Sequence, residues 1–293
     1  MIKRTLSHII NPDQAISRPK GNGVIHVKTT NQYYYPSHKT PYMLATQLNG
    51  KGNYRLNGRP IEISERYFYF LNENDELEIR FNEKATVETL LVLFDNDFIH
   101  DCESCIQSST VGLLDDPFDK TNRLTTIPEV PFVLNGQLRL LLSNLTDPAL
   151  TQEVLDDCLY ELIIAFDSIE KTTRGELRKI DVVKKSTQQE LYRRLFLAKE
   201  YLHDHVNSSV SLDSLASAVG MNKFHLLANF KNLFDDTPHQ YLVKLKLEKA
   251  KKMLRSKKYN VTQTCYALGF TSLGSFSHSF ARYFGKTPAS ILK

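Results

Sequence analysis

The sequence predicts an α+β protein with an N-terminal β-barrel followed by helices, and a C-terminal all-α domain made of two helix-turn-helix units. Three observations lead to this prediction. Residues 23–95 hold seven short stretches rich in β-branched and aromatic residues. After the loop at 115–117 the hydrophobic spacing becomes helical. An internal repeat then places Leu226, Phe230, Phe234 and Thr237-Pro238 fifty residues before Phe276, Phe280, Phe284 and Thr287-Pro288.

The strand-like stretches are separated by turn residues, and Asn57-Gly58 is the clearest turn. An Asn-Gly pair between two such stretches favours a two-residue hairpin, since both residues accept positive φ. The expected strands are GVIHVKT, YMLATQLNG, NYRLNG, RPIEIS, RYFYFLN, ELEIRF and VETLLVLF. Seven neighbouring strands favour a sandwich or a barrel. We assign this domain to residues 1–115.

Two apolar stripes with helical spacing follow in residues 116–168. Leu138, Leu141, Leu142 and Leu145 form the first. The second consists of Leu150, Val154, Leu155, Cys158, Leu159, Leu162, Ile163 and Phe166, with Asp147-Pro148 as its expected N-cap and first position. Such stripes either pack within the subunit or form a helix–helix dimer seam, and the sequence leaves both open. The charged stretch 169–185 is expected to be a partly helical linker.

Residues 186–293 contain short helices marked by cap signals. A capping-box pattern at 186–189 opens a helix to about Val206, and Ser211 caps a second helix that Gly220 ends. Thr237-Pro238 opens a long helix to about Leu254. The expected helix-turn-helix units are 212–234 and 260–284. In such a unit the second helix enters the major groove of DNA.

The net charge of +4 is unevenly distributed along the chain. Residues 186–293 hold 16 Lys and Arg against 7 Asp and Glu, whereas residues 1–185 hold 21 against 26. The C-terminal third is therefore +9 and the remainder −5. A basic segment favours a polyanionic partner. Charge alone would also fit a membrane surface, but the helix-turn-helix pattern favours DNA as the anionic partner.

The composition is that of a soluble globular protein, with 41% hydrophobic and 24% charged residues. The longest apolar run, Leu90–Phe94, is far shorter than the roughly 20 residues of a membrane helix. Asn11 and Pro12 interrupt the N-terminus before an apolar run of secretory length. We therefore expect a cytoplasmic protein without a membrane partner.

One cysteine pair has the spacing of a possible metal or redox site. Cys102 and Cys105 follow His100, and three such groups are compatible with zinc or redox chemistry. The sequence contains no second CxxC to complete a site, so a reduced loop is the alternative. We expect no metal, no cofactor and no catalytic residue.

Residues 186–293 resemble the DNA-binding domain of AraC/XylS-type transcription regulators. The resemblance rests on the segments LDSLASAVGM, FKNLFDDTPHQYL, KLEKA, ALGF and FSHSFARYFGKTP. It implies that a recognition helix from each unit enters adjacent segments of the major groove. It also implies double-stranded promoter DNA, RNA polymerase and a second copy of the chain as partners.

The resemblance assigns the DNA-facing residues. In the first unit they are Asn222, Lys223, Phe224, His225, Leu227, Ala228 and Lys231; in the second they are Ser272, Leu273, Gly274, Ser275, His278 and Arg282. We assign Asn222 and His278 to polar base contacts, and Lys223, His225, Lys231 and Arg282 to phosphates. Because many of the other positions are apolar or small, we expect contacts with thymine methyl groups and a T/A-rich site.

Three positions depart from the family pattern. Asp235 stands where the family usually has Gly, in a position that needs left-handed backbone. Thr264 and Cys265 replace the usual aliphatic residue and Ala, and we expect Cys265 to be a small buried hydrophobe.

The stretch Pro36–Phe81 resembles, more loosely, the cupin-like sensor domain that often precedes this module. The resemblance implies a small-molecule effector inside the barrel and a dimer formed by the helices after it. The expected pocket residues are Tyr35, His38, Tyr42, Tyr54 and Tyr69. A barrel interior filled by these rings is the alternative. The scattered histidines 26, 38 and 100 argue against a cupin metal site.

These observations favour a dimeric, sequence-specific DNA-binding transcription regulator. A DNA-modifying or repair enzyme with the same C-terminal domain and reactive Cys102 and Cys105 is the rival from another class. A ligand-binding protein that does not bind DNA is the third reading.

Overall fold

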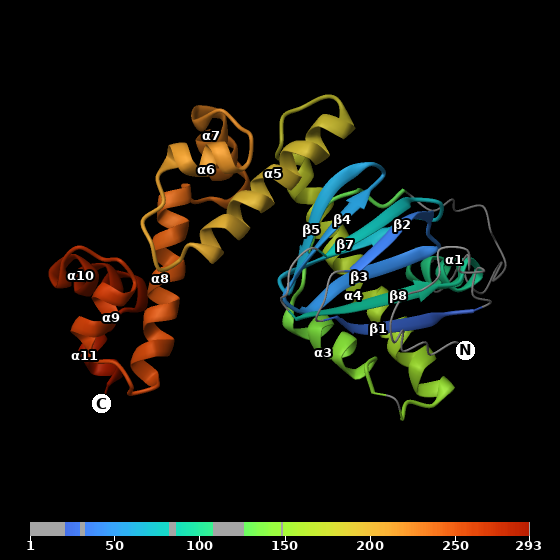
Figure 1. The fold of residues 1–293 in the computed structure, drawn as a ribbon, viewed down its shortest axis with the longest axis horizontal. Helices are drawn as coiled ribbons and strands as arrows, with labels where there is room; N and C mark the ends of the chain where they lie inside the picture. The colour runs from blue at the N-terminus through green and yellow to red at the C-terminus, as the bar shows by residue number, and fades with distance from the viewer. Residues whose placement is uncertain (1–20, 30–32, 82–85, 108–125, 148, 293) are drawn as a thin grey trace. The chain divides into compact units, whose positions relative to one another are not determined.

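The structure is a computed structural model that describes residues 21–29, 33–81, 86–107, 126–147 and 149–292 (Figure 1). The chain divides into two compact units, Met1–Gly175 and Glu176–Lys293. The division falls inside the segment 169–185 that the sequence assigns to a linker. Within the described ranges, no helix is both long enough and apolar enough to cross a membrane.

The first unit is a nearly closed antiparallel β-barrel, as the sequence predicts. Its strands are β1 (Gly23–Thr29), β2 (Tyr33–Lys39), β3 (Tyr42–Asn49), β4 (Lys51–Leu56), β5 (Arg59–Ser64), β6 (Tyr67–Leu71), β7 (Glu76–Phe81), β8 (Val87–Phe94) and β9 (Phe132–Val133). They are ordered β1-β8-β3-β6-β5-β4-β7-β2, and β9 pairs with β6. All seven predicted stretches form strands. The predicted hairpin is confirmed, with φ of 50° at Asn57 and 76° at Gly58.

Strand β2 was not predicted, and its sequence gives the reason. Its seven residues are YYYPSHK, with Pro36 in the middle. The register with β7 shifts between Tyr35 and His38, so the proline lies at an irregularity of a strand at the end of the sheet order. Proline within a sheet is confined to such places, because it has no N–H to donate.

Both faces of the sheet are buried. The barrel interior holds an apolar cluster that includes Met43, Tyr54 and Tyr69. On the opposite face, Phe166 of helix α4 (Gln152–Arg178) lies 4.4 Å from Phe70 between ring centres, and Phe68, Phe94 and Phe132 join this stack. Figure 1 shows α4 behind the sheet. The aromatic stack therefore holds the helix against the barrel.

Among the described residues of this unit, the other helices are α1 (Asn96–Gln107) and α3 (Gly136–Asn144). The predicted stripe on α3 is confirmed, since Leu138, Leu141, Leu142 and Leu145 are buried. The predicted start of the next helix at Asp147-Pro148 is wrong. Helix α4 begins at Gln152, and the Asp147 carboxylate instead accepts from the amide of Ala149 in the preceding turn.

The second unit is all-α, as predicted. Its helices are α5 (Lys185–Asp204), α6 (Leu212–Ala218), α7 (Lys223–Phe234), α8 (Pro238–Arg255), α9 (Val261–Ala267), α10 (Leu273–Phe284) and α11 (Pro288–Ile291). The predicted capping box at 186–189 is wrong, because α5 begins one residue earlier, after Lys184, without a side-chain cap. The cap predicted at Ser211 and the Thr237-Pro238 start are confirmed, and Thr237 forms a capping box with Gln240.

Candidate DNA-binding surface and barrel pocket

The two helix pairs α6–α7 and α9–α10 have matching turns. Gly220 and Gly269 both adopt positive φ, 61° and 71°. After each glycine, the next amide reaches back into the preceding helix, from Met221 to Ala216 and from Phe270 to Cys265. Positive φ at this place favours glycine, because an L side chain would be strained there. Each pair is therefore a helix-turn-helix unit with the same local geometry.

Aromatic residues anchor each second helix in the core. Phe230 on α7, and Phe276 and Phe280 on α10, are fully buried, as is Leu226 at the position matching Phe276. Phe234 and Phe284 are half-buried. Because these side chains share one face, the opposite face of each helix is left toward solvent. Cys265 is also fully buried, as expected for a small hydrophobe.

Twelve of the thirteen predicted DNA-facing residues lie on the exposed faces. These are Asn222, Lys223, Phe224, His225, Ala228, Lys231, Ser272, Leu273, Gly274, Ser275, His278 and Arg282. Phe224 is 70% exposed, which is unusual for so large an apolar side chain. Leu227 is half-buried and lines a hollow together with Leu215 of α6 and Leu242 of α8.

Two of these residues also cap their helices. The Asn222 side-chain oxygen accepts from the amide of Phe224 at 2.9 Å, and the Ser272 hydroxyl accepts from the amide of Ser275 at 3.1 Å. Both bonds satisfy amides that would otherwise lack a partner at a helix start. The cap uses the oxygen of Asn222, so its NH₂ group is the donor on this face. Lys223 forms an ion pair with the exposed Asp213 at 3.0 Å.

The repeat extends to the supporting helices. Arg194-Leu195 and Ala198-Lys199 of α5 recur 52 residues later in α8 as Lys246-Leu247 and Ala250-Lys251. The Arg194 guanidinium donates to the carbonyl of Gly220 at 2.7 Å. This part of the repeat has a separation of 52 residues, whereas the aromatic positions recur at 50, so the two do not share one register in the sequence.

Comparison with known proteins agrees with this geometry. A family model described as a helix-turn-helix domain matches residues 215–293. The probable transcriptional regulator LumQ of Photobacterium leiognathi is 30% identical over 94 residues, which are 32% of this chain and 38% of LumQ. The transcriptional activator RhaS of Escherichia coli is 34% identical over 98 residues, 33% of this chain and 35% of RhaS.

The C-terminal unit is an AraC-type helix-turn-helix domain. The chain spans less than two fifths of the length of these two curated relatives. Among solved structures, ToxT from Vibrio cholerae aligns over 93% of this chain and 98% of its own, with 12% identity and a TM-score of 0.38.

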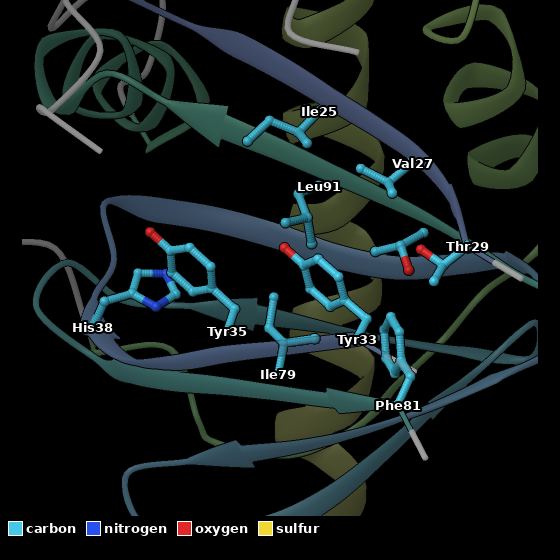
Figure 2. Close-up of a pocket in the computed structure, with 10 residues that line it drawn as sticks. Ile25, Val27, Thr29, Tyr33, Tyr35, His38, Ile79, Phe81 and Leu91 are labelled. Carbon is cyan, nitrogen blue, oxygen red and sulfur yellow. The ribbon is translucent and has the colours of Figure 1, made fainter. Parts of the chain in front are cut away.

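Outside the AraC-type domain, the barrel contains a small apolar pocket (Figure 2). It is lined by Ile25, Val27, Thr29, Tyr33, Tyr35, His38, Ile79, Phe81, Thr89 and Leu91. Figure 2 shows Tyr33, Tyr35 and His38 pointing from β2 toward the side of Ile25 and Leu91. The cavity volume is about 40 Å³, which is space for a few water molecules.

The pocket contains two of the five predicted effector residues, Tyr35 and His38. Tyr54 and Tyr69 are buried in the barrel core, and half-buried Tyr42 does not line the pocket. Gln47 donates a hydrogen bond to the Tyr54 hydroxyl, and burial raises the pKa of that phenol. Tyr35, Tyr54 and Tyr69 belong to one buried cluster, so all three rings face the barrel interior, but of these three only Tyr35 borders the cavity.

The pocket lining carries no carboxylate, lysine or arginine. Burial lowers the pKa of His38, although the Pro36 and Leu77 backbone groups oppose this shift. Burial also raises the pKa of Tyr35. At neutral pH the pocket is therefore uncharged, with hydroxyl groups and one imidazole as its polar groups.

Cys102 and Cys105 lie on helix α1, so the reading of this segment as a reduced loop is wrong. Cys102 is buried, whereas Cys105 and the preceding His100 are exposed. The buried thiol therefore does not converge with the other two groups. Among the residues that the structure describes, no three His, Cys, Asp or Glu are grouped so that they could hold a metal ion. Since LumQ and RhaS are named as transcriptional regulators, the enzyme alternative is not favoured.

Proposed function

We propose that this protein is a transcription regulator that binds promoter DNA with the exposed faces of α7 and α10. The observation that carries the proposal is the pair of recognition helices, each with a buried aromatic face and an exposed polar or small face, in a segment of net charge +9. The named relatives LumQ and RhaS support it. As a regulator of promoters, the protein would act in the cytoplasm and meet RNA polymerase there.

Binding to DNA is tested by selecting duplexes from a random library and measuring affinity at several salt concentrations. Phosphate contacts release counterions, so the logarithm of the association constant should fall linearly with the logarithm of salt concentration. Lys231→Met should reduce the magnitude of that slope by roughly 1. Lys171→Met is the matched control, because Lys171 is an exposed lysine of α4 in the other unit. Affinity that does not depend on salt would contradict the proposal.

We also propose that α3 and α4 form a dimer seam. Val154, Tyr160 and Ile164 on α4 are 40–46% exposed, and Leu140 on α3 is 64% exposed. Exposed apolar side chains on these two helices fit an interface between two copies. Deleting residues 137–167 would test the seam, but it would also remove core residues such as Phe166 and so disturb the fold. A sharper test is Ile164→Lys, with fully exposed Val183→Lys as control. Sedimentation velocity should show a monomer for Ile164→Lys only, and a dimer for both variants would exclude this seam.

An effector in the barrel is the third part of the proposal. The uncharged lining favours a neutral molecule with a hydroxyl group over a carboxylate or an amine. A cavity of about 40 Å³ must widen to hold one, so binding would couple to movement of β2. Neutral phenols should raise the melting temperature of the wild type and have less effect on Tyr35→Phe. A larger shift with benzoates than with phenols would contradict the uncharged ligand.

A further inference from the structure

The turn of the second helix-turn-helix unit contacts the turn that follows α5, the helix that supports the first helix-turn-helix unit. Asn207 lies in the turn after α5, and Gly269 lies between α9 and α10. A Cβ atom at Gly269 would stand 3.0 Å from the carbonyl oxygen of Asn207. The two turns therefore lie so close that a side chain at position 269 would be crowded, and this contact adds to the covalent link through α8.

Helix α8 contributes two lysines to the same place. The Lys249 ammonium donates to the side-chain oxygen of Asn207 at 2.9 Å. The Lys246 ammonium lies 3.3 Å from where the Gly269 Cβ would stand and 5.6 Å from the centre of the Phe270 ring. Lys246 is only 6% exposed. We name Asn207, Lys246, Lys249 and Gly269 the Asn207 clasp.

The clasp joins the supports of both recognition helices. Arg194 on α5 holds the Gly220 turn, which directly precedes α7. The backbone carbonyl of Asn207, three residues after the end of α5, lies against the Gly269 turn that precedes α10, and the Asn207 side chain accepts from Lys249 of α8. Both recognition helices are thus anchored to α5 and the turn that follows it. If α8 were the only connection, its 18 residues could bend or twist and change the distance between the two recognition helices.

We propose that Asn207 and Lys249 are positioning residues that fix the spacing between α7 and α10, and with it the number of base pairs between the two half-sites. The proposal rests on the proposed function. One base pair changes the separation by roughly 3.4 Å and the rotation by about a tenth of a turn. Loss of the clasp frees α10 to follow a half-site displaced by that amount, while each unit keeps its own base contacts.

The test uses the full-length chain and a duplex selected by the wild type from a random library. One base pair is inserted or removed between the two half-sites, and the affinity ratio between native and altered spacing is measured. We expect the wild type to lose roughly tenfold or more on altered duplexes. For Asn207→Ala and Lys249→Met, the loss of affinity on the altered duplexes should be smaller than that of the wild type by a factor of roughly three to ten.

The control is Lys252→Met, which removes the same charge from an exposed position of α8. It should lower affinity for every duplex and keep the wild-type spacing ratio. Asn207→Asp keeps the acceptor oxygen for Lys249 and should also keep the ratio. Circular dichroism establishes that each variant is folded.

The outcomes separate the two proposals. A wild-type chain that selects no duplex overturns the proposed function, and the clasp's role falls with it. A selected duplex whose spacing ratio is the same for wild type, Asn207→Ala and Lys249→Met overturns the clasp alone. A changed ratio in Lys252→Met would assign the effect to charge and also overturn it.

Discussion

The ammonium of Lys199 lies 4.4 Å from the centre of the Phe234 ring. The rings of Phe196 and Tyr241 are also near, at 5.0 and 5.5 Å. The repeat-related Lys251 lies 4.4 Å from Phe284. In both helix-turn-helix units, a lysine of the supporting helix therefore forms a cation–π interaction with the last turn of the recognition helix. This interaction holds the two helices together.

Lys199→Met is expected to change the pH dependence of stability. Burial lowers the pKa of Lys199, although Glu176 and Glu200 oppose the shift. Between that lowered pKa and the usual 10.5, the unfolded chain keeps a proton that the folded chain has released. The free energy of unfolding contributed by this group therefore rises with pH across this window.

The measurement is urea unfolding of the wild type and Lys199→Met at about pH 8 and about pH 10. The stability of the wild type relative to the variant should increase at the higher pH. Lys171→Met, on the surface of α4, should show no such change relative to the wild type. A difference for Lys199→Met that is independent of pH would contradict the prediction.

Asp235→Gly is expected to stabilise the AraC-type domain. Asp235 ends α7 with φ of 59°, and Gly285 ends α10 in the same conformation with φ of 68°. Left-handed backbone strains a residue with a Cβ atom but not glycine, and glycine is the usual residue at this cap. The substitution should raise the free energy of unfolding by about 1 kcal/mol. Thermal unfolding of the full chain measures it.

The matched control exchanges the two caps. Gly285→Asp should lower stability by about the same amount, because it places a Cβ atom in the same backbone conformation. If Asp235→Gly destabilised the domain, the Asp235 side chain would have to make a contribution larger than the strain it carries.

Much of the fold could be predicted because it depends on local patterns. Strands β1 and β3–β8 have alternating or continuous apolar residues between turn residues, and α6–α10 have N-cap residues and apolar faces. The recognition helices were predicted on the same basis, since their buried rings recur at helical spacing. Strand β2 was missed because Pro36 interrupts it. Helix α1 was missed because NDFIHDCESCIQ is mostly polar and lacks a clear stripe.

The functional details that sequence could not provide depend on distant contacts. Asn207 and Gly269 are 62 residues apart, and nothing local to either residue indicates that their backbones touch. The pocket shows the same limit. Tyr35 and Tyr54 are both strand tyrosines of the same buried cluster, and nothing in the sequence near either one indicates that only Tyr35 borders the cavity.

Gly52→Ala is expected to destabilise the barrel. A Cβ atom there would stand 2.5 Å from the Gln47 amide nitrogen, 2.6 Å from the Tyr54 ring and 2.7 Å from the Phe81 ring. These groups are buried and packed, so overpacking should lower the free energy of unfolding by about 1–3 kcal/mol. In Gly23→Ala, on β1, the added methyl group has no neighbour within 4 Å and should have little effect. Equal stability of the two variants would show that the interior has room to rearrange.

Phe224→Ala is expected to weaken binding to T/A-rich DNA without affecting the fold. The ring is 70% exposed at the start of α7, so its removal should change the free energy of unfolding by less than about 0.5 kcal/mol. If the ring contacts thymine methyl groups, affinity for the selected duplex should fall roughly tenfold. Tyr266→Ala is the control, since Tyr266 is 59% exposed on α9 and lies outside the predicted surface.

Replacing thymine by uracil in the selected duplex tests the contact itself, because uracil lacks only the methyl group. The wild type should lose affinity on the uracil duplex at the bases that Phe224 touches. Phe224→Ala should lose less affinity than the wild type between the two duplexes, since one partner of the methyl groups is already gone. An equal loss for wild type and variant would mean that the ring and the methyl groups act independently. A G·C-rich selected consensus would contradict the thymine contact at the outset, and specificity would then have to come from polar contacts such as those assigned to Asn222 and His278.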